Sequence, residues 1–453
     1  MTIVALPLLL LAFLFAKRIF MGRFGYADAV AVLHFSAWQN LVLGYFAPDL
    51  SELHFRALLV YNFLIAGGIC AVFFLWNLGK GHWRGLLPTY RAFAAVLALA
   101  AISVGLFGFN GASSIASLRN IIGPMLFTTV GFAVASRLHT DKRIAYLTVV
   151  IASMVISVGV YERFYQPDFW YWFNIEELWN KKGIANLNRV GIPSNWYAAE
   201  RIGDFYLRRM VSSFADPVNL GAFFYLAFVS GYLIKSRLGM IIGVAGILLG
   251  ISKGGFLGLL VFSVVYAYFR APKIVFLLTV LMSSIIGGVF IYISFTHFTS
   301  SVYTHMSGSL QGFLALTETP MGLGLGRTGT LANQLGDLGH QRIRESGTGL
   351  IIGQLGAPGF AVFCYFIYSL ARRLLSIPDK RVRIASLSLL LGITFNIVFN
   401  EVALSPNSSA LYFVQVGVMI SLYARPAMRL ALAARIRQAL FPARRVWLPV
   451  RPA

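Results

Sequence analysis

Long apolar runs separated by polar connections dominate the chain, and thirteen such runs can be distinguished. Most approach the roughly 20 residues that a helix needs to cross a bilayer, and none alternates apolar and polar residues as a membrane β-barrel strand does. The pattern predicts an all-α, polytopic integral membrane protein with about 12–13 transmembrane helices. The predicted spans are residues 2–16, 29–48, 57–79, 92–110, 118–136, 144–161, 213–234, 238–252, 254–269, 274–296, 347–371, 384–402 and 409–424.

Composition agrees with this prediction. Hydrophobic residues make up 58% of the 453 residues and charged residues 12%, whereas about a quarter of the residues in a soluble protein are charged. Both cysteines, Cys70 and Cys364, lie in apolar runs, which argues against a disulfide framework. We find no His, Cys, Asp or Glu cluster with metal-ligand spacing, so we expect no metal and no other cofactor. The first run lacks the basic region and cleavage site of a removed signal peptide, so we expect it to remain as a helix.

Basic residues are distributed unevenly between the two sets of connections. If the spans cross alternately, one set comprises loops around 17–28, 80–91, 137–143, 235–237, 270–273 and 372–383 and the tail from 425. This set holds 25 of the 38 Lys and Arg residues and three acids, so the positive-inside rule places it in the cytoplasm. Anchoring to anionic lipid then explains the net charge of +22 better than nucleic-acid binding does.

The sequence GISKGG, residues 250–255, decides how the eighth and ninth spans are connected. One fused helix would invert every later segment and leave only 14 basic residues on the cytoplasmic side. We therefore predict two short helices that meet on the outer side at Lys253. Each would be roughly 22 Å long, shorter than the roughly 30 Å hydrocarbon core, so Lys253 should lie slightly below the outer surface. A recessed lysine either snorkels or lines a polar cavity.

These predictions divide the chain into six segments. Membrane helices occupy residues 1–161, 213–296 and 347–424. Residues 162–212 and 297–346 form two large outer loops, and residues 425–453 form a basic amphipathic tail in the cytoplasm. Both loops contain aromatic residues, which argue against disorder.

The first outer loop contains DFWYWFNIEELW, residues 168–179. It predicts an interfacial helix with Trp170, Trp172 and Trp179 at headgroup level, because these rings are apolar with a polar edge. The alternative is a platform on which sugars stack.

The second outer loop contains MGLGLGRTG, residues 321–329, which superficially resembles a nucleotide-binding loop. No strand or βαβ unit surrounds it, so nucleotide binding is not expected. Gly322, Gly324 and Gly326 instead predict a tight turn that brings Arg327 against another group.

Several basic residues on the predicted outer face suit a lipid-linked phosphate or pyrophosphate. Arginine grips phosphate oxygens with two parallel hydrogen bonds, and lysine acts as a point charge. Alternatively, these residues bind ordinary phospholipid headgroups or pair with Glu200, Asp204 and Asp337. The candidate pyrophosphate-binding residues are Arg208, Arg209, Lys253, Arg327, Arg342 and Arg344.

The seventh span opens with RRMVSSFADPVNLGAFF, residues 208–224. Asp216 followed by Pro217 is a common helix start, with Asp as the cap and Pro in the first turn. Arg208 and Arg209 are not required by any structure that the sequence predicts. We therefore expect these two arginines to bind a pyrophosphate.

Three motifs together resemble the O-antigen polymerase and ligase superfamily. RRMVSSFADPVNLGAFF resembles its Arg, small residue, Phe, Asn/Asp-Pro, Leu-Gly signature, and GISKGG resembles its Ser-Arg-Gly step, with Lys253 in place of Arg. TPMGLGLGRTG, followed by ESGTGLIIGQLGAPG, is similar to its Pro-x-x-Gly-x-Gly loop and the next helix. The motifs occur in the family's order between residues 208 and 359.

The resemblance implies a membrane glycosyltransferase similar to the GT-C type, acting on undecaprenyl-pyrophosphate-linked glycans at the periplasmic face of a bacterial inner membrane. It carries over Arg209, with Arg208 beside it, and Lys253 as pyrophosphate-binding residues. Ligases of the family typically have His-Asn where this chain has Glu345-Ser346, which favours a polymerase. The implied partners are the lipid-linked donor, a glycan acceptor and membrane lipids, with a chain-length regulator as a further candidate and no nucleic acid.

The expected reaction is glycosyl transfer from a lipid pyrophosphate to an acceptor hydroxyl. Basic residues would stabilise the departing charge without a metal. Glu345 is the candidate general base, with Asp216 and His340 as alternatives, although a carboxylate beside a helix N-terminus can also be a dipole partner. The alternative functions are a ligase that transfers glycan to lipid A–core and a flippase or transporter of lipid-linked sugars, for which polar groups near the bilayer midplane are expected.

Overall fold

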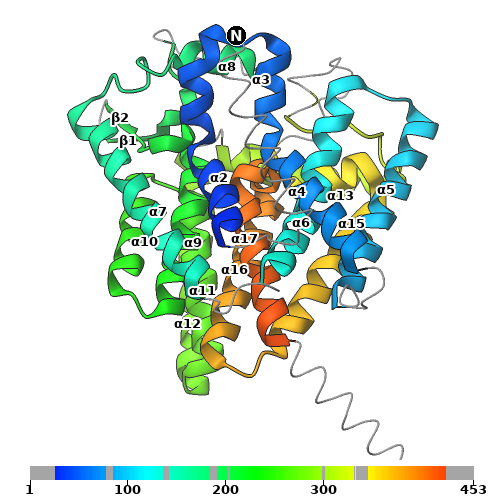
Figure 1. Cartoon of the computed structure of the whole chain (residues 1–453). Coiled ribbons are helices and arrows are strands. Elements are labelled where there is room, and N and C mark those ends of the chain that lie inside the picture. Colours follow the sequence, from blue (N-terminus) through cyan, green and yellow to red (C-terminus); the bar gives the residue numbers. More distant parts are fainter. Residues whose placement is uncertain are drawn as a thin grey trace, which may run out of the picture.

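The computed structural model describes residues 26–77, 85–135, 142–183, 191–202, 205–297, 301–330, 332 and 345–424, and this part is almost entirely helical (Figure 1). Helices occupy twelve of the thirteen predicted spans, and the first span and the tail from 425 lie outside the described residues. The all-α prediction is confirmed except for one small sheet. The elements are α2 Tyr26–Phe46, η1 Ala47–Asp49, α3 Glu52–Leu59, α4 Tyr61–Asn77, α5 Leu87–Phe107, α6 Gly111–Ala135, α7 Lys142–Val160, η3 Tyr161–Tyr165, α8 Ile175–Lys181, η4 Ser194–Trp196, β1 Tyr197–Ile202, β2 Phe205–Arg208, η5 Ser212–Phe214, α9 Pro217–Ile234, α10 Arg237–Leu249, α11 Lys253–Arg270, α12 Lys273–His297, α13 Ser301–Glu318, α15 Gly347–Leu375, α16 Lys380–Phe399, η6 Glu401–Leu404, α17 Pro406–Met419 and η7 Ile420–Ala424.

Six helices of the described part are long and apolar enough to cross a membrane, or seven if the bent pair α3 and α4 forms one span. By helix length and composition the chain is therefore a multi-pass membrane protein, and its described part shows six or seven of the 12–13 predicted spans at full length. Helix α10, with 13 residues, is shorter than the roughly 20 residues that cross a bilayer, whereas α17 continues into η7 and covers residues 406–424. The six are α5, α6, α7 extended to Tyr165, α9, α15 and α16.

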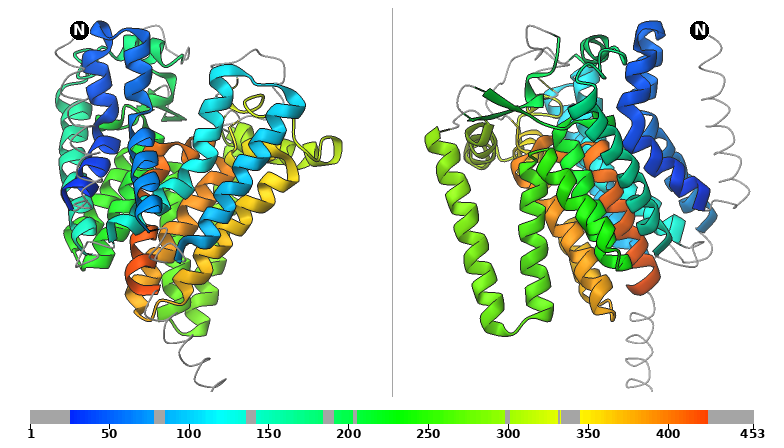
Figure 2. Two further views of the ribbon diagram at one scale, coloured as in Figure 1. Left: turned by 45° about the vertical axis from the view of Figure 1, so that its right-hand side comes forward. Right: turned by 90° about the vertical axis from the view of Figure 1, so that its left-hand side faces the viewer.

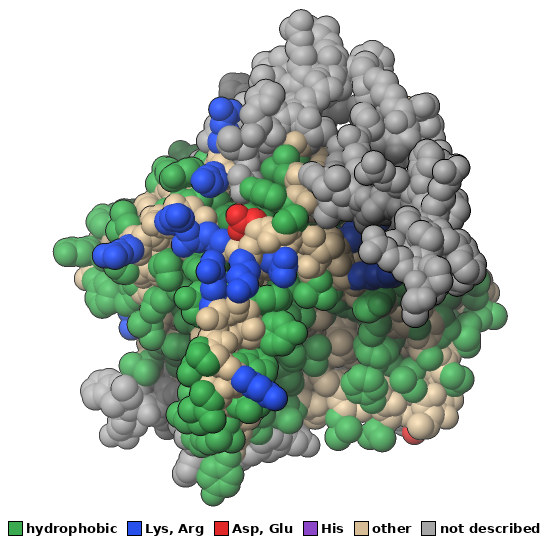
Figure 3. Space-filling view, turned by 90° about the horizontal axis from the view of Figure 1, so that it is seen from below, with side chains coloured by type: hydrophobic (Ala, Val, Ile, Leu, Met, Phe, Trp, Pro, Cys, Tyr) green, Lys and Arg blue, Asp and Glu red, His purple; other side chains and the backbone are tan. Residues whose placement is uncertain are grey.

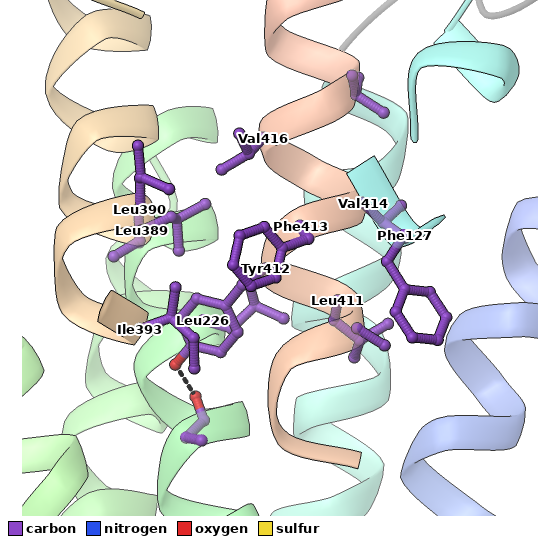
Figure 4. Close-up of a cluster of buried hydrophobic side chains, with 14 of the residues drawn as sticks. Phe127, Leu226, Leu389, Leu390, Ile393, Leu411, Tyr412, Phe413, Val414 and Val416 are labelled. Atoms are coloured by element: carbon purple, nitrogen blue, oxygen red, sulfur yellow. Dashed lines mark hydrogen bonds between the residues drawn. The ribbon is translucent and has the colours of Figure 1, made fainter. Parts of the chain in front are cut away.

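Helix α17 lies at the centre of the bundle, between α6, α9 and α16 (Figure 4). Its Tyr412 ring is buried, and the hydroxyl donates a hydrogen bond to the carbonyl of Ala222 in α9. A Cβ at Gly131 of α6 would overlap the backbone of Val414 in α17. The two backbones therefore approach closely only because glycine stands at this position, as is common between membrane helices.

Helices α9, α10 and α11 form the scaffold of the motifs. Asp216 caps α9 and Pro217 is its first residue, while Lys235 ends it in the left-handed conformation. Residues 250–252 separate α10 from α11, and the Ser252 side chain caps α11 by accepting from the amide of Gly255. The predicted break between two helices at Lys253 is confirmed, although α11, with 18 residues, is longer than predicted. The outer side and the depth of Lys253 stay predictions. Helix α11 also packs against α12, and Figure 2 shows these two helices side by side at one edge of the bundle.

The first outer loop folds into a small lobe. It contains α8 and the antiparallel pair β1–β2, and it packs on α2 and η1 through a second hydrophobic cluster. The predicted interfacial helix over 168–179 is helical only from Ile175. Trp170 and Trp179 are 1% and 5% exposed within this cluster, whereas Trp172 is 58% exposed, and their headgroup level stays a prediction. The difference in exposure arises because α2 and η1 provide an apolar surface that covers the loop.

The second outer loop is largely helical in its described part. α12 continues to His297, and α13 occupies residues 301–318 and packs on α15. Residues 333–344, which include the predicted His340, Arg342 and Arg344, lie outside the described residues.

Basic side chains gather on one face of the molecule, at the end where α9 and α11 finish (Figure 3). They flank the short connections between helices, and Asp379 among them caps α16. This face corresponds to the loops in which the sequence concentrates positive charge. Its residues are Lys235, Arg237, Arg270, Lys273, Arg372, Arg373, Lys380, Arg381 and Arg383.

Candidate functional site

The described candidate residues lie at the opposite end of the bundle. We call it the α9 end, because α9 begins there. Helices α11, α15 and α17 also begin there, and α5, α10 and α16 finish there. Hydrogen bonds tie these helix ends together, for example from Ser408 of α17 to Asn219 of α9 and from Ser346 before α15 to Val398 of α16. The loops at this end therefore form one connected layer.

Arg208 pairs with Glu162, a buried carboxylate in η3, which continues α7. Its Nη2 lies 2.6 Å from Glu162 Oε1, and the side chains are 18% and 0% exposed. The other oxygen of Glu162 accepts hydrogen bonds from the amides of Val211 and Ser212 at 3.3 and 3.4 Å. Arg208 neutralises a carboxylate that binds the backbone just before α9. The expectation that Arg208 has no structural role is therefore wrong.

Arg209 binds the break between α10 and α11. Its Nε donates to the carbonyl of Gly250 at 3.0 Å and its Nη2 to that of Ile251 at 3.3 Å. A third bond, from Nη1, reaches the carbonyl of Asn195 at 3.2 Å. Helix C-termini leave carbonyls without intrahelical partners, so Arg209 also has a structural role that the sequence did not predict. Lys253 lies just after this break, half-buried in the first turn of α11.

Asp216 is fully occupied as a helix cap. Its carboxylate accepts from the amides of Val218 and Asn219 at 3.4 and 3.0 Å, and from the side-chain amides of Asn219 and Asn195 at 2.6 and 3.1 Å. The predicted cap is confirmed. Burial raises the pKa of Asp216, and these hydrogen bonds and the charges of Arg209 and Lys182 oppose the rise. With four donors around it, the carboxylate is poorly suited to accept a proton from a substrate.

Lys182 is a basic residue of this end that the sequence reasoning missed. Its Nζ donates to Asn40 Oδ1 at 2.7 Å and lies 4.8 Å from the ring centre of Trp179. Burial lowers its pKa to about 8, and the charge of Asp216 opposes this shift. The only sequence signal was a pair of lysines, residues 181–182, that ends an aromatic segment. Lys182 thus adds a cation beside Asp216 and within the same electrostatic group as Arg209.

Arg327 lies in the predicted glycine turn. Gly322, Gly324 and Gly326 all have positive φ, a conformation that favours glycine. The guanidinium donates to the carbonyl of Phe107 at the end of α5. The prediction of a turn that brings Arg327 against another group is confirmed, and that group is a helix C-terminus.

Glu345 precedes the cap of α15, as predicted, and its side chain is 46% exposed. Its φ of 52° is uncommon for a residue with a side chain. His305 of α13 lies beside it, with Nδ1 2.9 Å from the Glu345 carbonyl oxygen and 3.5 Å from Oε2. The sequence did not predict this contact, because the two residues are 40 positions apart.

Glu401, like Glu162, is a carboxylate that was not predicted from the sequence. It is 3% exposed, and its Oε2 accepts from the amide of Thr330 at 2.7 Å. Its own amide donates to the carbonyl of Glu345 at 3.3 Å. A Cβ at Gly329 would stand 2.9 Å from the carboxylate, so this glycine allows the close approach. The signal in the sequence was a single acid directly after an apolar run.

The structure thus brings the candidates into three groups at one end. Arg209, Lys253, Asp216 and Lys182 surround the start of α9 and the α10–α11 break, whereas Glu345 lies with His305 and Glu401 at the start of α15. Arg327 stands at the end of α5. Within the part of the chain that the structure describes, no group of three or more His, Cys, Asp or Glu side chains is arranged to hold a metal ion. No protein-family model and no curated protein matches the chain.

Proposed function

We propose that the chain is a polymerase that joins undecaprenyl-pyrophosphate-linked oligosaccharide repeat units into a cell-surface polysaccharide such as O-antigen, capsule or exopolysaccharide. The proposal includes a GT-C-like architecture and a place in a bacterial inner membrane. The positive-inside rule puts the basic face, with the C-terminus, in the cytoplasm and the α9 end in the periplasm.

The observation that carries the proposal is that one end of the bundle holds both a partly exposed carboxylate, Glu345, and the cations at the α10–α11 break. Of the four carboxylates described above at the α9 end, Glu345 alone has a partly exposed side chain, because Glu162, Asp216 and Glu401 are buried and hydrogen-bonded. Glycosyl transfer from a pyrophosphate needs both a base and cations, and the order of the three sequence motifs supports the same reaction.

In the proposed reaction, an acceptor hydroxyl forms a bond to the anomeric carbon of the donor sugar. The bond from that carbon to the pyrophosphate oxygen breaks, and undecaprenyl pyrophosphate leaves with the electron pair. Glu345 takes the hydroxyl proton, and the cations at the α10–α11 break stabilise the negative charge of the leaving group. Such donors act most strongly where water is partly excluded.

Glu345→Gln is the sharpest test of this mechanism. Its backbone carbonyl, rather than its side chain, makes the close contacts with His305 and Glu401, so the fold should survive. We expect polymerisation to fall by about 10²–10⁴-fold, the usual contribution of a general base. The measurement incubates purified protein with lipid-linked repeat units alone and resolves the ladder of products.

Glu177→Gln is the matched control, since Glu177 is 43% exposed on α8, and it should leave the ladder unchanged. A Glu345→Gln variant with normal turnover would remove Glu345 from the mechanism. Wild-type protein that forms product only after lipid A–core is added would instead be a ligase. Arg209→Ala is a less informative variant, because it also removes the contacts that hold the α10–α11 break.

A further inference from the structure

Arg119 lies in the third turn of α6, although the span predicted from the sequence begins only at residue 118. α6 runs from Gly111 to Ala135 and is one of the helices apolar enough to cross the membrane. Arg119 is its ninth residue, about 12 Å along the axis at 1.5 Å per residue. A charged side chain at such a position is costly, and it normally pairs with another charged group or marks a binding site.

Within the described residues, no carboxylate neutralises Arg119. Its Nε and Nη2 approach Oδ1 of the neighbouring Asn120 at 3.4 and 3.3 Å. No ion pair joins it to a carboxylate of the described residues. Arg208, in contrast, has Glu162, and Arg327 has the Phe107 carbonyl. Arg119 therefore keeps a charge and donor capacity that the described part of the chain does not use.

One face of α6 gives access to this side chain. Residues 112, 115 and 119 are spaced by three and four positions, so they share one side of the helix. Ala112 and Ile115 are exposed, Ile115 by 62%, and Arg119 is half-buried. All residues from Asn120 to Ala135 are buried. This face is open over its first two turns and closes just beyond Arg119.

We propose that Arg119, with Asn120 beside it, binds the phosphate group of a lipid that reaches it along this face. The guanidinium can offer two parallel donors to phosphate oxygens, and Ile115 supplies an apolar surface for a hydrocarbon chain. The site is separate from the α10–α11 break, because α6 packs on α4, α5 and α17, whereas α10 and α11 pack on α9.

The identity of this lipid rests on the proposed function. A polymerase takes two substrates that both carry a lipid pyrophosphate, so it needs a second phosphate site besides the one at the α10–α11 break. A ligase needs only one such site for the donor. We assign Arg119 to the lipid pyrophosphate of the acceptor.

Lipid titrations of the full chain in detergent test the site without turnover. Undecaprenyl pyrophosphate, phosphatidylcholine and inorganic pyrophosphate are added separately, and bound molecules are counted by native mass spectrometry. We expect Arg119→Gln to bind one molecule of undecaprenyl pyrophosphate at least about tenfold more weakly, as for the loss of one charged hydrogen-bonding group. Phosphatidylcholine binding should not change. Arg56→Gln is the control, because Arg56 is exposed and pairs with Glu52.

The unfolding temperature without lipid separates binding from a structural role. Arg119→Gln removes a half-buried charge that has no ion-pair partner among the described residues, so the variant should unfold at the same temperature as the wild type or higher. Equal binding of undecaprenyl pyrophosphate by the variant and the wild type would overturn the site. The site would also be overturned if only the binding of inorganic pyrophosphate depended on Arg119. If the wild type makes no polymer but lipid binding depends on Arg119, the site stands and the acceptor assignment fails together with the proposed function.

Discussion

At the scale of single residues, the meaning of a charge at the α9 end depends on its partner. Glu162, Asp216 and Glu401 are buried and each accepts backbone hydrogen bonds, so they organise loops. Glu345 is partly exposed and has one nearby side-chain partner, His305. Burial and hydrogen bonding therefore separate structural carboxylates from a candidate base, although all four look alike in the sequence.

The Arg208–Glu162 pair provides a stability prediction. Arg208→Ala leaves the carboxylate of Glu162 buried without its counter-ion, which typically costs about 3–5 kcal/mol. We expect a large fall in the thermal unfolding temperature. Combining Arg208→Met with Glu162→Gln should restore part of the loss, because neither member of the pair then carries a charge.

Arg56→Ala is the matched control for this pair. Arg56 lies 2.7 Å from Glu52, nearly the same separation, but both side chains are more than half exposed. Exposed pairs contribute about 0–1 kcal/mol, so its unfolding temperature should barely move. Equal effects of Arg208→Ala and Arg56→Ala would contradict the structural role of the buried pair.

At the scale of elements, helix ends fix the geometry of the candidate site. Gly221 in the second turn of α9 allows Ser252 to approach closely, since a Cβ there would stand 1.7 Å from Ser252 Oγ. Ser252 caps α11, so its position sets that of Lys253. The packing of α9 on the break thus determines where this cation lies.

Gly221→Ala should therefore destabilise the protein although alanine favours helix. The overlap with Ser252 should cost about 1–3 kcal/mol, which outweighs a gain of about 1 kcal/mol in helix propensity. Polymerisation should fall as well, because Lys253 moves. Thermal unfolding and the product ladder measure the two effects.

Gly105→Ala in α5 is the corresponding control. No atom lies within 4 Å of a Cβ at this position, so only the propensity gain remains, and stability should be unchanged or higher. A Gly221→Ala variant as stable as Gly105→Ala would show that Ser252 adjusts without strain.

At the scale of the whole molecule, the separation of charge predicts the orientation in the membrane. Arg237 belongs to the basic face, whereas Ser194 is exposed on the lobe above α9. In a variant with both native cysteines replaced by alanine, Ser194→Cys should react with an impermeant maleimide from the outside of spheroplasts. Arg237→Cys should react only after permeabilisation, and the reverse pattern would invert the proposed orientation.

The sequence alone determined the helices and the break between two of them at Lys253. Apolar runs, helix caps such as Asp216 and Ser252, and glycines in the turn before Arg327 act through neighbours in the chain, so their effect can be read locally. The sequence also predicted the concentration of positive charge that forms the basic face, because the loops that carry it are short.

Which charged groups meet follows from the packing of the helices alone. Arg208 finds Glu162 across 46 positions, Arg209 binds carbonyls 41 and 42 positions away, and His305 reaches Glu345 from another helix. These contacts depend on how the helices pack, and no local pattern encodes them. The burial of the indoles of the first loop also follows from packing, since an apolar residue can be covered by lipid or by protein with little difference in its sequence pattern.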